Sequence, residues 1–220
     1  MGLKYYVSLC CEEEKKQEEH KISHAIGIDL GVTSLVTTSD GIKYPKLKIK
    51  RIEEHIKVYQ ERLSRCVRRS KNYFKIKNKI ARLYQKIKNM RKFYIHEITN
   101  DLIEDNDLIV CETLKTKKMI EESSSRGLTK GIVNASFREI ERQLDYKSKW
   151  NNKVLIKINT YFPSNKICHH CGIRNEINDL SIRSFECKKC KCINDRDINA
   201  SINILDEGIK IAINKGLINI

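Results

Sequence analysis

Two cysteine pairs constrain the fold of this 220-residue chain more than any other feature of its sequence. Cys168 and Cys171 form one C-x-x-C pair, Cys187 and Cys190 form the other, and 15 residues separate the two pairs. Each pair can bend a tight turn around one edge of a tetrahedron, and thiolates are preferred ligands of zinc. The spacing therefore predicts a zinc ribbon that holds one structural Zn²⁺, and four ordinary buried thiols are the less favoured alternative.

The other cysteines and the nearby histidines lie outside this spacing. His169, His170 and Cys192 are next to the expected ligands, and we expect them to be exposed or to lie beside the metal rather than to bind it. The remaining cysteines have no paired partner and are expected to act as small hydrophobic residues. They are Cys10, Cys11, Cys66 and Cys111.

The composition indicates a soluble protein that is not exported. Apolar residues make up 40% of the chain, which is enough for one domain with an appendage or for two small domains, and excludes a wholly disordered chain. No run of about 18 apolar residues occurs, and the N-terminal residues lack a signal-peptide pattern. We therefore expect a cytoplasmic protein with no membrane partner, in which clustered cysteines bind metal.

The excess positive charge is confined to one segment. Residues 46–92 contain 18 Lys and Arg against three acids, whereas the rest of the chain contains 25 basic and 25 acidic residues. Apolar residues recur at spacings of three and four on both sides of Ser70-Lys71-Asn72, which predicts two antiparallel helices joined by a turn. A hairpin that only keeps the protein soluble is the alternative, but so one-sided a charge favours a nucleic-acid partner.

Short apolar runs and amphipathic segments alternate along the remainder of the chain. This order predicts an α/β fold whose sheet begins with three antiparallel strands. Residues 115–131 are polar and serine-rich, and are expected to form a mobile loop. Strands are expected at about 24–30, 35–38, 42–44, 108–111 and 154–158, and helices at 135–150 and from about Asp197 onward.

Three acidic residues stand at the ends of these expected elements. Asp29 lies near the end of an apolar strand, Glu112 ends another, and Asp197 opens the last helix. An acid in apolar surroundings is costly unless it lies at the rim of the sheet or binds a ligand. Singly, Glu112 could be solvated and Asp197 could be an N-cap. Together, the three could hold two Mg²⁺ ions about 4 Å apart for in-line attack on a phosphodiester.

Five motifs in a fixed order resemble those of the TnpB family, the RNA-guided nucleases of insertion sequences that are related to type V CRISPR effectors. The resemblance extends from about residue 20 to about residue 206. It implies a RuvC-like RNase H fold that is interrupted by a basic helical hairpin and by a zinc-bearing insert that binds the target nucleic acid. The motifs are GIDLGV, IVCETLK, YKSKW, FPSNKICHHCG, and FECKKC followed by NDRDINASINI.

The resemblance also implies roles for particular residues. Mg²⁺-dependent hydrolysis of DNA is the implied activity, and DNA and a guide RNA are the implied partners. The last catalytic aspartate of the family matches Asp197 rather than Asp195. The implied catalytic and magnesium-binding residues are Asp29, Glu112 and Asp197, and the implied zinc ligands are Cys168, Cys171, Cys187 and Cys190.

The resemblance further implies a division of the chain into domains. Full-length members carry recognition and wedge domains ahead of the first aspartate, whereas 28 residues precede Asp29 here, so a truncated or minimal member is expected. Its function is then that of a transposon-associated RNA-guided DNA endonuclease, or alternatively that of a non-catalytic DNA- or RNA-binding remnant. A zinc-ribbon transcription factor does not explain the three acids. The expected parts are a wedge remnant at 1–20, a RuvC-like domain at 21–163 with the hairpin at about 46–100, a zinc-ribbon insert at 164–193, and the end of the RuvC-like domain at 194–220.

Overall fold

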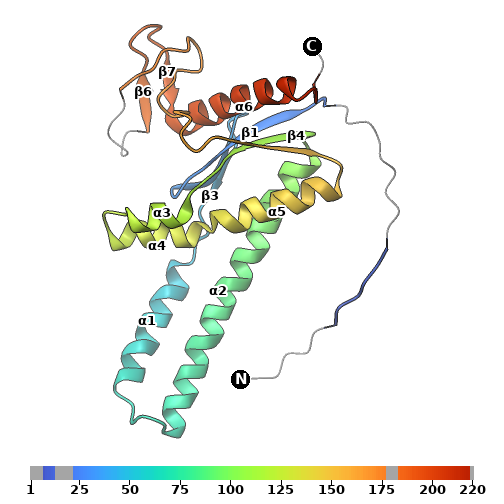
Figure 1. Ribbon diagram of the computed structural model, residues 1–220. Helices are drawn as coiled ribbons and strands as arrows, with labels where there is room; N and C mark the ends of the chain where they lie inside the picture. The colour runs from blue at the N-terminus through green and yellow to red at the C-terminus, as the bar shows by residue number, and fades with distance from the viewer. Residues whose placement is uncertain (1–6, 13–21, 177–182, 219–220) are drawn as a thin grey trace. The chain divides into compact units, whose positions relative to one another are not determined.

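The computed structural model describes residues 7–12, 22–176 and 183–218 (Figure 1). The chain divides into two compact units, one formed by residues 1–18 and 47–94 and the other by residues 19–46 and 95–220. Over the described ranges, no helix combines the length and the apolar character needed to cross a membrane.

The second unit is built on a mixed five-stranded sheet, as the expected α/β order requires. Its strand order is β3-β2-β1-β4-β5, in which β2 is antiparallel to both β3 and β1, and β1, β4 and β5 are parallel to one another. Hairpin-length connections permit the antiparallel start, whereas the parallel strands need long crossovers. The strands are β1 (Ala25–Leu30), β2 (Ser34–Thr38), β3 (Lys43–Pro45), β4 (Leu108–Glu112) and β5 (Val154–Ile158).

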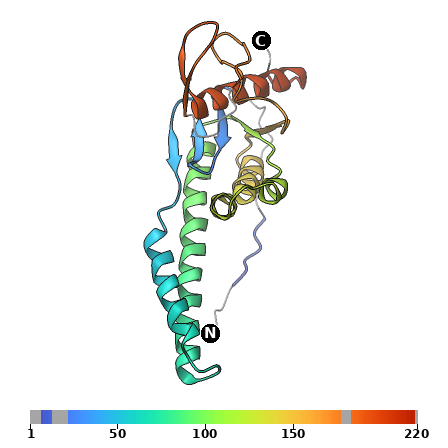
Figure 2. The same ribbon diagram turned by 90° about the vertical axis from the view of Figure 1, so that its left-hand side faces the viewer.

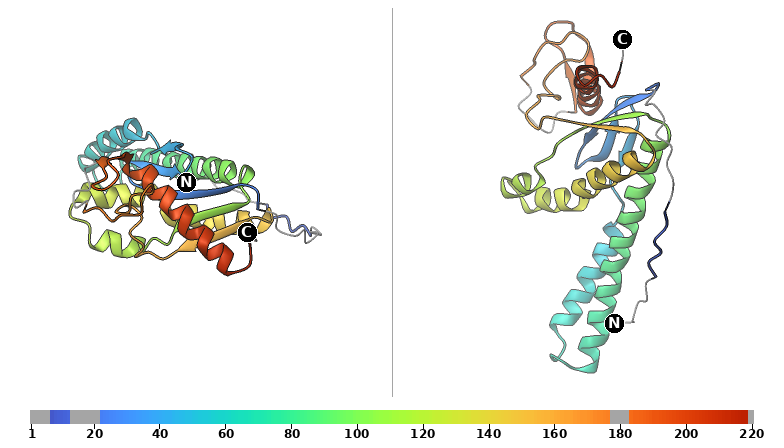
Figure 3. Two further views of the ribbon diagram at one scale, coloured as in Figure 1. Left: turned by 90° about the horizontal axis from the view of Figure 1, so that it is seen from above. Right: turned by 45° about the vertical axis from the view of Figure 1, so that its right-hand side comes forward.

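Helices cover both faces of this sheet, and its central strands β1 and β4 are accordingly apolar except for one acid near the end of each. Helix α6 (Arg196–Asn214) crosses one face, and α5 (Phe137–Trp150) lies on the other (Figures 2 and 3). A Cβ at Gly27 would lie 2.2 Å from the Ser201 carbonyl oxygen, and one at Gly208 would lie 2.3 Å from Val110 Cγ1. These two glycines therefore allow the helix to approach the sheet closely.

The first unit contains the expected helical hairpin. Helix α1 (Lys50–Ser64) and the N-terminal part of α2 (Lys71–Glu104) share a core that includes Ile56, Ile80 and Ile87. The turn differs slightly from the expectation, because residues 65–70 make the connection and α2 already begins at Lys71. Ser70 Oγ accepts a hydrogen bond from the Tyr73 amide at 3.1 Å, so a side-chain cap begins the second helix.

The expectation of a mobile loop at 115–131 was wrong. This segment contains α3 (Thr116–Glu121) and most of α4 (Arg126–Ala135). The serines form local contacts that support the helices: Ser125 Oγ accepts a hydrogen bond from the Leu128 amide at 3.2 Å, and Ser123 Oγ is hydrogen-bonded to Thr129 Oγ1. A serine-rich stretch therefore marks a helix start here, because hydroxyl groups cap helices as readily as they solvate loops.

The cysteine-rich insert contains a small second sheet. Strands β6 (Ser184–Glu186) and β7 (Ile193–Asp195) are antiparallel, and β7 leads directly into α6. Residues 177–182 of the expected zinc-ribbon segment lie outside the described residues. The expected wedge remnant at 1–20 also lies mostly outside them, and its described part, residues 7–12, has no helix or strand.

Candidate functional site

Two of the three acids lie at the carboxyl ends of adjacent parallel strands. Asp29 is the fifth residue of β1, and Glu112 is the last residue of β4. The parallel register pairs Ile28 with Cys111, so the next residue of each strand lies at the same edge of the sheet. Loops and helix ends gather at this edge in parallel sheets, which makes it the usual position for a binding site.

The third acid reaches this edge from α6. Asp197 lies in the first turn of that helix, and the N-cap is Asp195, whose Oδ1 accepts hydrogen bonds from the amides of Asp197 and Ile198 at 3.1 Å each. Asp195 Oδ2 also pairs with Lys43 Nζ at 2.7 Å. Asp195 is therefore occupied in structural contacts, and the capping role does not fall on Asp197.

Asp29 is buried, and the charges of the other two acids act on it. Burial raises the pKa of Asp29, the negative charges of Glu112 and Asp197 raise it further, and the result is a pKa of about 7. Burial also raises the pKa of Glu112. Like charges held in a partly buried site disfavour ionisation of one another. The arrangement therefore attracts cations, and carboxylate oxygens are the donors that Mg²⁺ prefers.

Two arginines offset part of this negative charge. Arg183 places a guanidinium nitrogen 3.6 Å from Asp197 Oδ1, and another of its nitrogens donates to Thr33 Oγ1 at 2.8 Å. Arg196 is buried, and its charge lowers the pKa of Asp29. The sequence analysis did not identify Arg183, because it lies between the cysteine pairs without any spacing that relates it to the acids.

A set of hydrogen bonds holds Glu112 and the start of the cysteine-rich insert in place. Ser164 Oγ donates to Glu112 Oε1 at 3.1 Å. Asn203, on α6, donates to the carbonyl oxygens of Ser164 and Ile167 at 2.7 Å each. Asn199, one turn earlier, also donates to Ile167 at 2.7 Å. The helix that carries Asp197 therefore also fixes the residue that orients Glu112, and the sequence analysis missed all three of these polar residues.

The four paired cysteines converge on one point. All four sulfur atoms lie within 4.8 Å of one another. The Cys168–Cys190 and Cys171–Cys187 sulfur separations are 3.7 and 3.5 Å. A tetrahedral zinc ion with Zn–S bonds of about 2.3 Å requires sulfur atoms about 3.8 Å apart. The donor set and its spacing therefore fit Zn²⁺.

The backbone of each cysteine pair forms the same tight turn. The Gly172 amide donates to the Cys168 carbonyl oxygen at 2.8 Å, and the Lys191 amide donates to that of Cys187 at 3.0 Å. Both residues that follow a pair have a positive φ, +72° for Gly172 and +60° for Lys191. The backbone amide of Cys190 is the main cause that lowers the pKa of Cys187 to about 6, which favours the thiolate that binds metal.

The residues next to the four cysteines lie outside the cluster. His169 and His170 are exposed, and the sulfur of Cys192 is outside the four-cysteine cluster. The side-chain amides of Asn175 and Asn194 donate to the sulfurs of Cys187 and Cys168 at 3.7 and 3.6 Å. These weak N–H···S contacts stabilise thiolates from beside the metal site.

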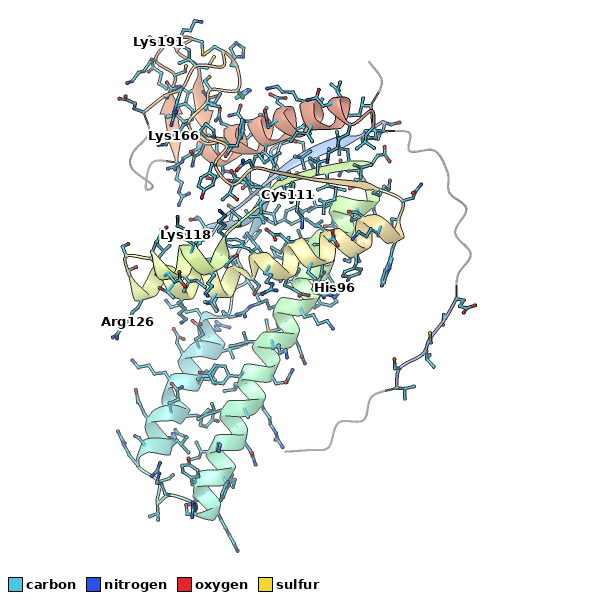
Figure 4. The ribbon with its side chains drawn as sticks, viewed as in Figure 1. His96, Cys111, Lys118, Arg126, Lys166 and Lys191 are labelled. Carbon is cyan, nitrogen blue, oxygen red and sulfur yellow. The ribbon has the colours of Figure 1, made fainter. Side chains whose placement is uncertain are left out.

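The unpaired cysteines do not share one environment. Cys111 is fully buried in β4 (Figure 4), and burial raises its pKa to about 12, so its thiol is inert as expected. Cys66 is partly buried, and its thiol donates to the Arg62 carbonyl oxygen at 3.3 Å. Cys10 and Cys11 are exposed, so the expectation that they act as small hydrophobic residues was wrong.

Two protein-family models match this chain, one in its first half and the other in its second half. The OrfB_IS605 family, described as "Probable transposase", matches residues 8–123. The Cas12f1-like TNB domain matches residues 137–204, which include α5, the cysteine-rich insert and the first half of α6.

The chain also resembles individual proteins along most of its length. The chain is 32% identical over 207 residues to a candidate RNA-guided DNA endonuclease of Streptomyces pristinaespiralis, covering 94% of this chain and 50% of the relative. It is 31% identical over 218 residues to the candidate RNA-guided DNA endonuclease InsQ of Escherichia coli K12, covering 93% and 54%. The chain therefore spans about half the length of the curated relatives that it matches.

A solved structure supports the fold. The cryo-EM structure of a CRISPR-Cas12f ternary complex matches with a TM-score of 0.65 at 20% identity, over 88% of this chain and 40% of that one. The mixed sheet, its covering helices and the cysteine-rich insert are therefore arranged as in part of that protein.

Proposed function

The chain belongs to the TnpB (OrfB) family, and we therefore propose that its second unit is a RuvC-like nuclease domain that cleaves DNA under the direction of a guide RNA. One observation carries the proposal. Asp29, Glu112 and Asp197 come from three separate elements, and burial together with the charges of Glu112 and Asp197 raises the pKa of Asp29 to about 7. Perturbed carboxylates at the carboxyl edge of a sheet are typical of catalytic sites.

The donor chemistry of these three residues fits magnesium. Asp29, Glu112 and Asp197 would hold the ions through their carboxylate oxygens. When bound, two Mg²⁺ ions supply activation of the attacking water and stabilisation of the leaving oxygen. Ser164 keeps Glu112 oriented through its hydrogen bond, and α6 keeps Asp197 at the edge of the sheet.

Arg183 has a separate role in this proposal. Its guanidinium lies beside Asp197 and Thr33 at the site. A guanidinium can donate two parallel hydrogen bonds to a phosphate, so Arg183 would bind the scissile phosphodiester and offset its negative charge.

The cleavage assay uses plasmid and single-stranded DNA with Mg²⁺ or Mn²⁺. We expect the 220-residue chain to produce at most weak, unguided nicking of single-stranded DNA. Fusion to the N-terminal half of a relative should add guide-dependent cleavage. Asp29→Ala should abolish both activities, and equal cleavage by that variant would overturn the nuclease proposal. A fusion that binds guide and target but never cleaves would instead identify a non-catalytic nucleic-acid-binding protein.

The basic hairpin would bind the nucleic-acid partners through their phosphates. Its lysines and arginines are spread over both helices, and phosphate contacts of this kind carry no sequence information. Affinity should therefore fall steeply with salt because bound counterions are released. Reversal of four charges, at Arg68, Arg69, Lys75 and Lys79, should flatten the salt dependence. An unchanged slope would contradict this assignment.

The cysteine-rich insert would hold one structural Zn²⁺ and contact the target strand. The four sulfurs have the spacing of a tetrahedral site, and Asn199 and Asn203 connect the start of the insert to α6. Zinc would therefore stabilise the backbone that orients Glu112, without any direct part in hydrolysis.

A further inference from the structure

The turn of the hairpin differs in chemistry from its sides. We define the hairpin tip as residues 62–75, which contain no acidic residue. Four of the seven arginines between residues 46 and 92 lie in this tip, whereas most lysines of the segment lie along the helices. Arginine binds phosphate through a planar fork and also stacks on flat groups, which lysine does not do. The basic residues of the tip are Arg62, Arg65, Arg68, Arg69, Lys71 and Lys75.

Two large apolar side chains are exposed among these charges. Val67 is 79% exposed and Phe74 is 49% exposed. Tyr73 packs edge-on against Phe74, with ring centroids 5.7 Å apart and an interplanar angle of 86°. Exposed apolar groups surrounded by cations do not contribute to the core of the hairpin, so they are available to a ligand that is both flat and negatively charged.

The backbone of the tip holds these groups in fixed positions. The Phe74 amide donates to the Ser70 carbonyl oxygen at 3.2 Å, and the Tyr73 amide donates to Ser70 Oγ. Arg69 has φ = +64°, a conformation that a non-glycine residue adopts only when its surroundings require it. Phe74 is therefore presented from the first turn of a long helix.

We propose that the hairpin tip binds unpaired nucleotides, with a base stacked on Phe74 beside Val67 and the flanking phosphates held by Arg68 and Arg69. Aromatic side chains within a basic surface are the usual means of binding single strands, because every base has an aromatic face. A paired base inside a duplex offers no free face, so the tip distinguishes single strands from duplexes. This inference rests on the proposed function, in which the whole hairpin binds nucleic acid.

The test compares binding of a short oligothymidylate with binding of a duplex of equal length by the full chain. Phe74→Ala should weaken single-strand binding about tenfold and leave the salt dependence unchanged, because stacking contributes affinity without neutralising phosphates. Duplex binding should change less than twofold. Phe74→Trp should restore single-strand binding. Phe93→Ala is the matched control, since Phe93 is 72% exposed on the same helix but outside the tip, and it should have no effect.

Two results would overturn the inference. One is an equal loss on single strand and duplex in Phe74→Ala, and the other is an effect of Phe93→Ala as large as that of Phe74→Ala. Competition by polyglutamate that is as strong as by the oligonucleotide would identify an acidic protein partner instead. Failure of the proposed function is distinct, because it would appear as weak, salt-independent binding of both probes by the unmodified chain.

Discussion

The fold disfavours the charged form of Asp29. Its pKa is about 7 in the fold against an ordinary 3.8, because of burial, Glu112 and Asp197. The folded chain therefore binds a proton that the unfolded chain has lost between about pH 4 and pH 7, and the free energy of unfolding falls across that window as pH rises.

Replacing Asp29 by Asn removes this cost. The free energy of unfolding without divalent metal should rise by roughly 1–3 kcal/mol near pH 8, measured by urea denaturation. Asp195→Asn is the control and should be less stable than the parent, because it weakens the N-cap of α6 and the contact with Lys43. An Asp29→Asn variant that is no more stable than the parent would show that the fold imposes no such cost on the Asp29 charge.

The fold lowers the pKa of Asp107, whereas it raises that of Asp29. Its carboxylate accepts hydrogen bonds from Lys153 Nζ at 2.8 Å and from the amides of Ser23 and His24 at 2.9 and 3.0 Å, and these contacts lower its pKa to about 2. The stabilisation is present above an ordinary pKa of 3.8 and is lost as pH falls through 2.

Asp107→Asn should therefore lower the free energy of unfolding by roughly 1–2 kcal/mol at neutral pH, and by little near pH 2. Denaturant titrations at several pH values would measure this difference. If the free energy of unfolding fell by the same amount at neutral pH and near pH 2, the charge of the Asp107 carboxylate would contribute nothing to stability.

Single residues also show what a sequence can and cannot predict about a site. Asp29 and Glu112 could be found because burying an acid at the end of an apolar strand costs free energy unless the acid binds a ligand or a partner. Ser164 and Arg183 could not be found, because each acts on a residue 52 or 14 positions away and nothing local marks the contact. Only the fold brings such partners together.

Among the elements, the cysteine-rich insert is the one that we expect to depend on a bound metal. Cys187→Ser should lose the zinc and increase amide hydrogen exchange in the described parts of the insert, while the five-stranded sheet stays protected. Cys192→Ser is the matched control and should keep one zinc per chain, because its sulfur lies outside the cluster. Metal analysis of the purified variants measures both outcomes, and full zinc retention by Cys187→Ser would assign the fourth ligand to another residue.

Elements with a strong periodicity were predictable, and those with ambiguous local signals were not. The apolar runs of β1, β4 and β5 identified buried strands, and the isoleucine spacing identified the hairpin. The helices α3 and α4 were missed because serines mark loops and helix caps alike. The positive φ of Lys191 also has no signal in its residue type, since glycine is the usual occupant of that conformation.

At the scale of the whole molecule, charge and chemistry are divided between the two units. The hairpin carries the net positive charge of the chain, whereas the unit with the sheet carries the three carboxylates and the four cysteines. This division suits a protein in which one unit binds polyanions without sequence preference and the other acts on a phosphodiester.

The central claim is that Asp29, Glu112 and Asp197 form one divalent-metal site, and calorimetric titration of zinc-loaded protein with Mn²⁺ tests it most directly. The parent chain should bind Mn²⁺, and Asp29→Asn, Glu112→Gln and Asp197→Asn should each lose most of this binding, because a metal held at this edge of the sheet would need carboxylates from all three elements. Asp195→Asn should keep it, since that carboxylate is held by Lys43 and the helix amides. Mn²⁺ binding that persists in Asp29→Asn, or that disappears in Asp195→Asn, would contradict the account.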